Sequence, residues 1–326
     1  MKNLKVIYIL FGICVFLILT IVTIDLFKND ILGSKNQIRK SEIEKIVLKK
    51  LDEYGIQNEW IDKVHFSNLD YDSLDCVYKV KVPEDIDIPI FLNDLNKEFF
   101  KKNVSLISEE KKNTTTLKIY SGKILKFQSY LTYENSVKRA TNVIAFIVYG
   151  INDLSDSDRE IILNLAFPVS FVMIPSISSE NIVSQIKLAD KEYLIIINDD
   201  IKDAKYSLSS DYEPEMIRES INNIKQTFRG STGFLIDEKS QLYNSSFYNF
   251  LRDEFNKADI TLKQKSNYIK IPSENEEEMI SIFKFHSYNS DGKKIFYLST
   301  DELNILLDEI EKYKKKGNLV VLPSQI

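Results

Sequence analysis

Residues 144–153 read IAFIVYGIND, and this stretch decides the fold. Every position from Ile144 to Val148 is apolar, without the alternation expected of a strand that has one face in water. Such a run is typical of a strand buried on both faces, as in a parallel sheet covered by helices. Runs of the same β-rich kind recur to the end of the chain, and the full set is 143–148, 169–174, 193–197, 233–236, 260–262, 295–298 and 319–322.

Amphipathic helical patterns lie between most of these runs. Apolar residues recur at helical spacing near 161–165, 182–189, 216–224, 247–255 and 303–310. A capping box, Ser299-Thr300-Asp301-Glu302, marks the start of the last helix. Strands alternating with helices over residues 140–326 predict an α/β domain, and seven strands suit an incomplete barrel as well as an open sheet.

A smaller domain is predicted before it, over residues 41–133. Helical spacing of apolar residues begins at Ile43, strand-like alternation follows at 76–82, and a second helix is expected at 90–100. Three more strands are expected at 104–107, 115–120 and 124–133. This order indicates a small α+β domain, followed by a polar connection at 134–139.

The N-terminal segment predicts a membrane anchor. Residues 6–24 read VIYILFGICVFLILTIVTI, nineteen residues without a charge, and about 20 apolar residues suffice to span a bilayer as a helix. The run lacks the small-residue cleavage site of a signal peptide, so we expect an uncleaved anchor over 1–28 and a tether over 29–40. Lys2 and Lys5 favour a cytoplasmic N-terminus and an extracytoplasmic body.

Composition excludes some functions of the body. The chain has two cysteines, and one of them, Cys14, lies inside the apolar run at 6–24. No intrachain disulfide is therefore expected to stabilise the body. A net charge of −5 gives no broad basic field, and we expect no nucleic-acid partner. The sequence has no P-loop, no GxGxxG and no HExxH motif.

The order and spacing of five segments resemble the divergent polysaccharide deacetylase family. The segments are IAFIVYGIND (144–153), FPVSFVMIP (167–175), EYLIIIND (192–199), STGFLIDEKS (231–240) and GNLVVLP (317–323). The resemblance covers residues 140–326 and implies a distorted, seven-stranded (β/α) barrel. It also implies an ancestral activity as a hydrolase on N-acetylated glycans.

The metal-site residues of that family are not retained. The resemblance implies paired aspartates at positions 149 and 150, where this chain has Tyr149 and Gly150. It implies a histidine at position 196, where the chain has Ile196, and Asn-His where it has Ile236-Asp237. Since zinc requires about three convergent nitrogen, oxygen or sulfur ligands, we expect no metal and no other cofactor.

Polar residues at the predicted carboxyl ends of the strands are the candidate site, because ligands bind there in such folds. Asp153, Asp199 and Asp237 are candidate catalytic carboxylates, since a suitably spaced carboxylate pair is what glycoside hydrolysis uses. Tyr149, Asn152, Asn198 and Asp200 are candidate ligand-binding residues, with the tyrosine placed to stack on a sugar ring.

Three functions are compatible with these patterns. The first is a membrane-anchored, catalytically inactive deacetylase-like protein that binds a cell-wall glycan or an envelope protein. The second is an active carbohydrate deacetylase or hydrolase with a rearranged acidic site. The third is a purely structural partner that uses the domain at 41–133 as its contact surface.

Overall fold

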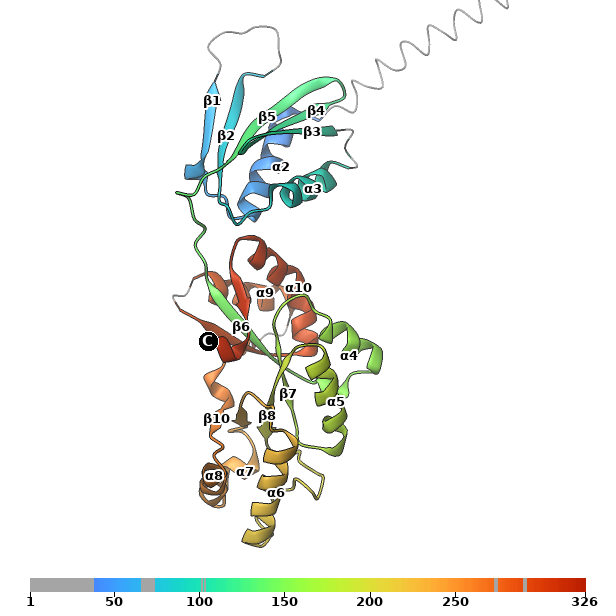
Figure 1. Ribbon diagram of the computed structural model, residues 1–326, viewed down its shortest axis with the longest axis vertical. Coiled ribbons are helices and arrows are strands. Elements are labelled where there is room, and N and C mark those ends of the chain that lie inside the picture. The colour runs from blue at the N-terminus through green and yellow to red at the C-terminus, as the bar shows by residue number, and fades with distance from the viewer. Residues whose placement is uncertain (1–37, 66–73, 101, 103, 273–274, 290–291) are drawn as a thin grey trace, which may run out of the picture. The chain divides into compact units, whose positions relative to one another are not determined.

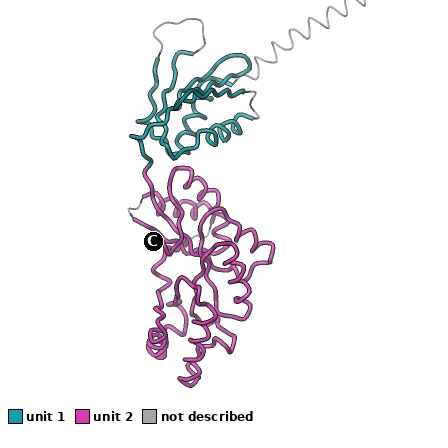
Figure 2. Tube along the Cα trace, in the orientation of Figure 1, with its two compact units in different colours: residues 1–139 teal, residues 140–326 magenta. Residues whose placement is uncertain are grey.

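The computed structural model divides the chain into two compact units, residues 1–139 and residues 140–326 (Figure 2). It describes residues 38–65, 74–100, 102, 104–272, 275–289 and 292–326. The expected membrane span at 6–24, and with it the anchor at 1–28 and most of the tether at 29–40, lies outside the described residues. Among the helices of the described ranges, none is both long and apolar enough to cross a membrane.

The C-terminal unit is built on a seven-stranded parallel sheet (Figure 1). Six of the seven strands predicted from apolar runs are confirmed, and the strand predicted at 260–262 is displaced to Leu262–Gln264. The sheet order is β10-β9-β8-β7-β6-β11, with β12 also paired to β6. Their bounds are β6 Val143–Tyr149, β7 Ser170–Met173, β8 Glu192–Ile197, β9 Phe234–Ile236, β10 Leu262–Gln264, β11 Lys294–Ser299 and β12 Leu319–Val321.

Strand β6 has three neighbours. Strand β11 pairs with it from Ile144 to Tyr149 along one side. On its other side, β12 pairs with residues 143–145 and β7 pairs with residues 147–148. The two partners divide that side of β6 between them, so the sheet is continuous only at its carboxyl end.

The sheet curls toward closure. After β10 ends at Gln264, the chain forms a bridge between Ile269 and Phe296 of β11. The Ile269 N–H donates to the Ile295 carbonyl at 2.9 Å, and the Tyr297 N–H donates to the Ile269 carbonyl at 2.8 Å. Because five residues of chain reach no further than about 18 Å, the two edges of the sheet lie near one another.

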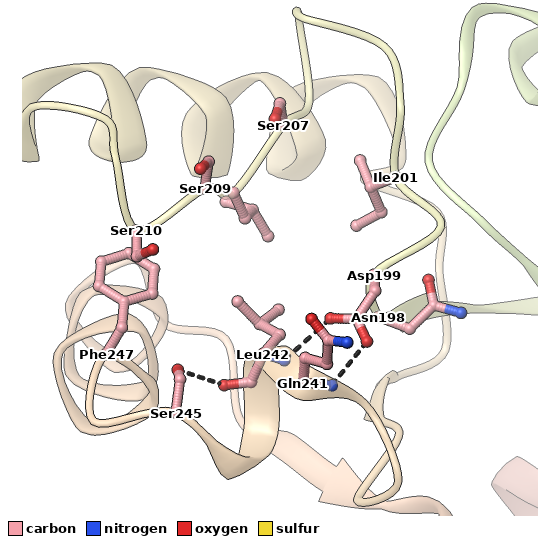
Figure 3. Close-up of a pocket in the computed structure, with 11 residues that line it drawn as sticks. Asn198, Asp199, Ile201, Ser207, Ser209, Ser210, Gln241, Leu242, Ser245 and Phe247 are labelled. Carbon is pink, nitrogen blue, oxygen red and sulfur yellow. Dashed lines mark hydrogen bonds between the residues drawn. The ribbon is translucent and has the colours of Figure 1, made fainter.

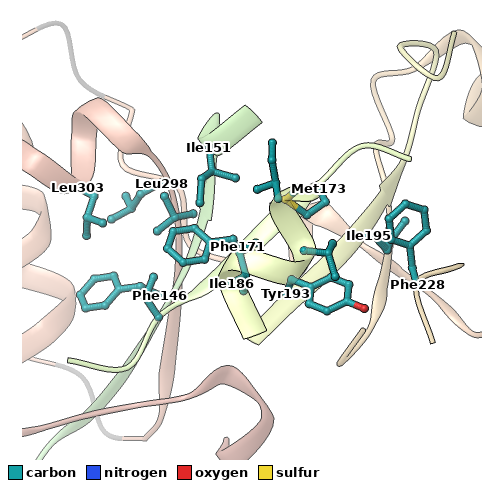
Figure 4. Close-up of a cluster of buried hydrophobic side chains, with 14 of the residues drawn as sticks. Phe146, Ile151, Phe171, Met173, Ile186, Tyr193, Ile195, Phe228, Leu298 and Leu303 are labelled. Carbon is teal, nitrogen blue, oxygen red and sulfur yellow. The ribbon is translucent and has the colours of Figure 1, made fainter. Parts of the chain in front are cut away.

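Two apolar layers lie on the two faces of this curled sheet. Alternate strand residues such as Phe146, Phe171 and Ile195 pack under the helices in the large core (Figure 4). The intervening residues form a separate buried cluster of Ile147, Val172, Leu194, Ile196, Leu235 and Tyr297. This second cluster occupies the concave side of the sheet, which explains why the strands read as continuously apolar.

Side chains cap the N-termini of five of the seven described helices of this unit, α4, α5, α7, α9 and α10. The predicted capping box is confirmed at the last helix, where Ser299 and Glu302 bond each other's backbone N–H groups. The helix bounds are α4 Asp156–Leu163, α5 Ile177–Leu188, α6 Pro214–Thr227, α7 Gln241–Asn244, α8 Tyr248–Lys257, α9 Glu276–Tyr288 and α10 Thr300–Lys315.

The described part of the N-terminal unit has a five-stranded mixed sheet with order β1-β2-β5-β4-β3, and the helices α2 and α3 (Figure 1). Buried residues of both helices, including Val47 and Phe91, join one core with alternate strand residues such as Leu117 and Leu131. The bounds are α2 Lys40–Glu53, β1 Ile61–His65, β2 Cys76–Val82, α3 Ile88–Phe99, β3 Val104–Lys111, β4 Thr114–Ser121 and β5 Ile124–Tyr133.

One strand of this unit was not predicted. Strand β1, with the sequence IDKVH, pairs only with β2 and is exposed at four of its five positions. An exposed edge strand rich in charge carries too few apolar residues for its alternation to be recognised.

Candidate functional site

The carboxyl ends of the parallel strands surround a cavity of about 240 Å³ in the C-terminal unit. Side chains that point to the concave side follow a period of two along each strand, and this period continues past the strand ends. It carries Tyr149 beyond Ile147, Asn198 beyond Ile196, and Asp237 beyond Leu235 into the cavity wall. We call this cavity the barrel mouth; its wall consists of Tyr149, Gly150, Asn152, Asp153, Val172, Ile174, Ile196, Asn198, Asp200, Asp237, Lys265 and Tyr297.

Two tyrosines form an aromatic wall of the barrel mouth. The rings of Tyr149 and Tyr297 are stacked, with centroids 5.1 Å apart and planes 20° from parallel. Tyr297 is buried, whereas Tyr149 remains 39% exposed. Burial, and after it the charge of Glu302, raises the pKa of the Tyr149 phenol above its ordinary value. Tyr149 therefore offers a neutral aromatic surface at physiological pH.

A partly buried ion pair lies beside this wall. Lys265 Nζ donates to Asp237 Oδ2 at 2.6 Å, and the two side chains are only 17% and 19% exposed. The backbone N–H of Lys239 donates to the other carboxylate oxygen, Oδ1, at 3.1 Å. Burial by itself would raise the pKa of Asp237, but the hydrogen bonds from Lys265 and Lys239 and the charge of Lys265 outweigh it and lower the pKa. Asp237 is thus held ionised with both oxygens occupied.

The same lysine contacts the aromatic wall. Lys265 Nζ lies 5.4 Å from the centroid of the Tyr297 ring, and Lys270 Nζ lies 5.6 Å from it. Ammonium groups near an aromatic face are attracted by its quadrupole, which fixes the Lys265 side chain further. The cation is therefore part of the wall of the barrel mouth and is already neutralised by Asp237.

Amide and carboxylate groups form the remaining rim. Asn152 Nδ2 donates to Ser179 Oγ at 2.9 Å, and Asn198 Nδ2 donates to Asp200 Oδ2 at 2.8 Å. These bonds orient both amides and leave acceptor capacity on them. Asp153 is exposed, and its carboxylate has no ion pair with any residue in the described ranges. The rim can both donate and accept hydrogen bonds to a neutral polar ligand.

Asp199 lies apart from the other candidates. Its carboxylate accepts the backbone N–H groups of Gln241 at 2.6 Å and Leu242 at 2.8 Å, at the start of α7 (Figure 3). It lines a neighbouring hollow of about 400 Å³, together with residues such as Ser209 and Phe247. The expectation that Asp199 shares one rim with Asp153 and Asp237 is therefore corrected, because consecutive residues after β8 point to opposite faces.

Gly150 makes the turn from β6 into the rim. Its φ of +92° is in the left-handed region, and a Cβ there would lie 3.4 Å from Thr300 Oγ1. A side chain at this position is therefore strained by the backbone itself. This turn directs the short 3₁₀ helix Ile151–Asp153, and with it Asn152 and Asp153, over the barrel mouth.

The side chains of the barrel mouth do not provide the donor set of a zinc site. In the described ranges, no three or more His, Cys, Asp and Glu side chains are grouped so as to hold a metal ion. His286 lies on α9 against Phe296, and His65 is exposed on β1. The mouth has Lys265 close to Asp237, and an ammonium group disfavours a cation at that carboxylate.

Sequence analysis missed two residues of the site, Lys265 and Tyr297. Tyr297 lies within an apolar strand and reads as core, which it also is. Lys265 stands directly after the short strand β10, in the sequence LKQK. The period of two that places Asp237 in the cavity wall would also have placed Lys265 there, if the last residue of β10 had been predicted correctly.

Comparisons with known proteins assign no family to the chain. No family model matches it, and no curated protein matches it. Three solved structures resemble it at TM-scores of 0.36, 0.38 and 0.37.

The first is the uncharacterized protein ATU2773 from Agrobacterium tumefaciens C58, which is 13% identical over 58% of this chain and 91% of that chain. The second is BA3943 from Bacillus anthracis, described as a CE4 family pseudoenzyme, which is 9% identical over 72% of this chain and 93% of its own. The third is a BA3943 mutant described as a CE4 family pseudoenzyme with restored enzymatic activity, 9% identical over 72% and 96%.

Replacement of Gly150 tests the geometry of the turn. Gly150→Ala should lower the free energy of unfolding by about 1–2 kcal/mol, because an L-residue is strained at this φ. Gly233→Ala is the matched control, since its new Cβ would meet only Leu194 Cδ2, at an ordinary 3.5 Å, and it should change stability by less than about 0.5 kcal/mol. Equal effects of the two substitutions in urea unfolding would show that the turn is not as described.

A double-mutant cycle tests the Asp237–Lys265 pair. Asp237→Asn, Lys265→Met and the double variant should give a coupling energy of about 1–3 kcal/mol in urea unfolding at pH 7. Because the pKa of Asp237 is lowered by folding, its contribution is present above the unfolded value of about 3.9 and disappears as the pH falls through the lower folded value.

The exposed pair Lys225–Asp259, with Nζ and Oδ2 3.4 Å apart, is the control for this cycle. Its coupling energy should be below about 1 kcal/mol. A coupling at Asp237–Lys265 no larger than that of the control, or one that does not change with pH, would contradict the assigned ion pair.

Proposed function

We propose that the C-terminal unit is a divergent polysaccharide deacetylase-type domain that binds a glycan at the barrel mouth and does not hydrolyse it. One observation carries this proposal. The barrel mouth joins a partly exposed tyrosine face to oriented amides and carboxylates, while its partly buried carboxylate, Asp237, is neutralised by Lys265. The resemblance of five sequence segments to the divergent deacetylases supports the same proposal.

The chemistry of the barrel mouth suits a sugar. A pyranose ring has C–H groups that pack on an aromatic face and hydroxyls that need hydrogen-bond partners at its edge. Tyr149 supplies the face, and Asn152, Asn198 and Asp200 supply the partners. Val172, Ile174 and Ile196 form an apolar floor on which the methyl group of an acetamido substituent could be buried. An N-acetylated glycan is therefore the proposed ligand.

The same groups are poorly suited to proton transfer. A general acid or base works best with a pKa near the working pH. Folding lowers the pKa of Asp237 and raises that of Tyr149, so both move away from neutrality. The direction of the two shifts supports the proposal that the barrel mouth binds without hydrolysis.

Asp153 is the residue on which the alternative function, hydrolysis, depends. It is the one candidate catalytic carboxylate of the barrel mouth that is exposed and has no ion pair with a described residue; Asp200, which is also exposed, accepts a hydrogen bond from Asn198. A hydrolase with a rearranged acidic site would have to use it, either to activate water or to hold a hard cation with Asp200. This alternative is separated from the first by an activity measurement.

Location and partner belong to the proposal as well. With residues 6–24 as an uncleaved anchor and the body on the extracytoplasmic side, a cell-wall glycan or an envelope protein would be the partner. The apolar run and the two lysines before it support this orientation.

Removal of the aromatic face should weaken glycan binding. Tyr149→Ala should weaken the binding of chitotetraose about tenfold, measured by calorimetric titration, since a stacking contact worth about 1.4 kcal/mol is lost. Phe285→Ala is the control, because Phe285 is 61% exposed on α9 and lies outside the barrel mouth. Equal affinities of the two variants and the unchanged protein for chitotetraose would contradict the proposal that the barrel mouth is the glycan site.

Purified protein should release no acetate from chitotetraose or peptidoglycan fragments, with or without added Zn²⁺ or Mg²⁺. The reason is that the two exposed carboxylates of the barrel mouth, Asp153 and Asp200, have no ion pair with a described basic residue, and no imidazole lines the cavity. Acetate release that is abolished by Asp153→Asn would overturn the non-enzyme proposal and establish the acidic-site hydrolase.

A further inference from the structure

The sheet of the N-terminal unit has one face that neither of its two described helices covers. Along β4 the residues alternate strictly, with Thr115, Leu117 and Ile119 buried and the residues between them partly exposed. Helices α2 and α3 pack on the buried side, where Val47 and Phe91 join the core. The opposite side, which we call the open face, carries the alternate residues of β2, β4, β5 and β3.

Lysines gather on the open face. Lys79 and Lys81 lie on β2 and are exposed, and Lys118 lies on β4 two strands away. Lys79 is in register with Tyr130 of β5, and Lys118 is in register with Gln128, one step along the same face. Lys81 is in register with Thr132, a further step along β5. With neighbouring strands about 4.8 Å apart and alternate residues about 7 Å apart, the Cα atom of Lys79 lies about 7 Å from that of Lys81 and about 12 Å from that of Lys118, and Lys81 and Lys118 lie about 17 Å apart.

These lysines differ from those elsewhere in the same unit. Lys50 and Lys63, on the helix-covered side, pair with Glu53 and Glu44, with Nζ–oxygen distances of 2.7 Å in both cases. Lys79, Lys81 and Lys118 form no ion pair with any residue that the structure describes. Lys79 and Lys81 lie within the Debye length of about 10 Å at 0.1 M salt, and Lys118 lies beyond it, so all three contribute to one positive field only at lower salt.

Acidic residues of this face lie at its margins. Asp62 is opposite Lys79 on the edge strand β1, and Glu109 is opposite Thr116 on the other edge strand, β3. Lys126 adds a further positive charge to the open face, because it alternates with the buried Phe127 on β5. A positive centre on a protein with a net charge of −5 points to an anionic partner.

The groups between the lysines are uncharged and polar. Gln128 Nε2 donates to the Tyr130 hydroxyl at 2.7 Å, and the hydroxyls of Thr114 and Thr132 are 3.0 Å apart. Hydroxyl and amide groups of this kind match the hydroxyls of a sugar chain. Among the described residues of the sheet, the large apolar side chains that are exposed lie on its edge strands or at a strand end, with Val64 36%, Ile107 47% and Ile124 38% exposed. The described part of the face therefore lacks the apolar centre that an interfacial membrane contact requires.

We propose that the open face binds a linear anionic polysaccharide. Lysine ammonium groups contact carboxylates or phosphates as point charges, without the fixed geometry of arginine, and a flat sheet can accept an extended chain along the lysine row. This inference does not depend on the glycan proposed for the barrel mouth. It assigns the N-terminal unit a binding role of its own.

The test uses the full-length protein and polygalacturonate as the probe, immobilised on a biosensor surface at 50 mM and 300 mM NaCl. Binding is expected at 50 mM salt, with at least tenfold loss at 300 mM because the attraction is screened. The variant K79Q/K81Q/K118Q should bind at least tenfold more weakly at 50 mM salt. The variant K79R/K81R/K118R keeps the charge and should bind as the unchanged protein does.

A control of equal charge separates this site from general electrostatics. The variant K45Q/K138Q/K202Q removes three exposed lysines outside the open face, so both glutamine variants change the net charge from −5 to −8. The control should bind polygalacturonate as the unchanged protein does. Equal losses in the two glutamine variants would overturn the proposal.

Three further probes define the partner. Neutral dextran should not bind, whereas single-stranded DNA and phosphatidylglycerol vesicles should bind at least tenfold more weakly than polygalacturonate at equal charge concentration. Equal or tighter binding of DNA or of vesicles would overturn the assignment to a polysaccharide. A properly folded K79R/K81R/K118R variant that fails to bind would overturn the role of positive charge.

Discussion

The C-terminal unit depends on the way strand β6 shares its two sides. One side is paired with β11 along its length, and the other is divided between β12 and β7. The sheet is therefore continuous at its carboxyl end, where Tyr149 closes β6, and it curls until Ile269 bridges to β11. This arrangement brings six strand ends around one small cavity, which is the geometric condition for any ligand site in the unit.

The architecture could be predicted because burial on both faces leaves an unmistakable pattern. Seven runs without polar alternation gave seven parallel strands, and the capping box at Ser299 gave the start of the last helix. Strand β1 was missed because IDKVH is an edge strand with four exposed positions. Elements that bury many apolar residues can therefore be predicted from the sequence, whereas elements that bury few, such as β1, are missed.

The site could be predicted only in part, because it depends on side-chain direction at strand ends. Six of the seven candidate residues line the barrel mouth: Tyr149, Asn152, Asp153, Asn198, Asp200 and Asp237. Asp199 does not, since its carboxylate accepts two backbone N–H groups of α7. The contact between Lys265 and Asp237 joins residues 28 positions apart, and it decides the charge of the barrel mouth. Residue type suggested an acidic rim, whereas the structure shows one acid already neutralised.

The two units are proposed to bind different kinds of ligand. In the C-terminal unit a barrel mouth with an aromatic wall and two carboxylates that have no ion pair with a described residue, Asp153 and Asp200, is proposed for a sugar. In the N-terminal unit a positive open face is proposed for an anionic polymer. The central claim is that the barrel mouth is the sugar site, and methyl NMR of protein labelled at Ile and Val during titration with chitotetraose tests it most directly. The account predicts shifts for the methyls of the cavity floor, Val172, Ile174 and Ile196, and none for the exposed Ile161 on α4 or Ile107 on β3. A titration that leaves the three floor residues unchanged while chitotetraose is bound would contradict the account.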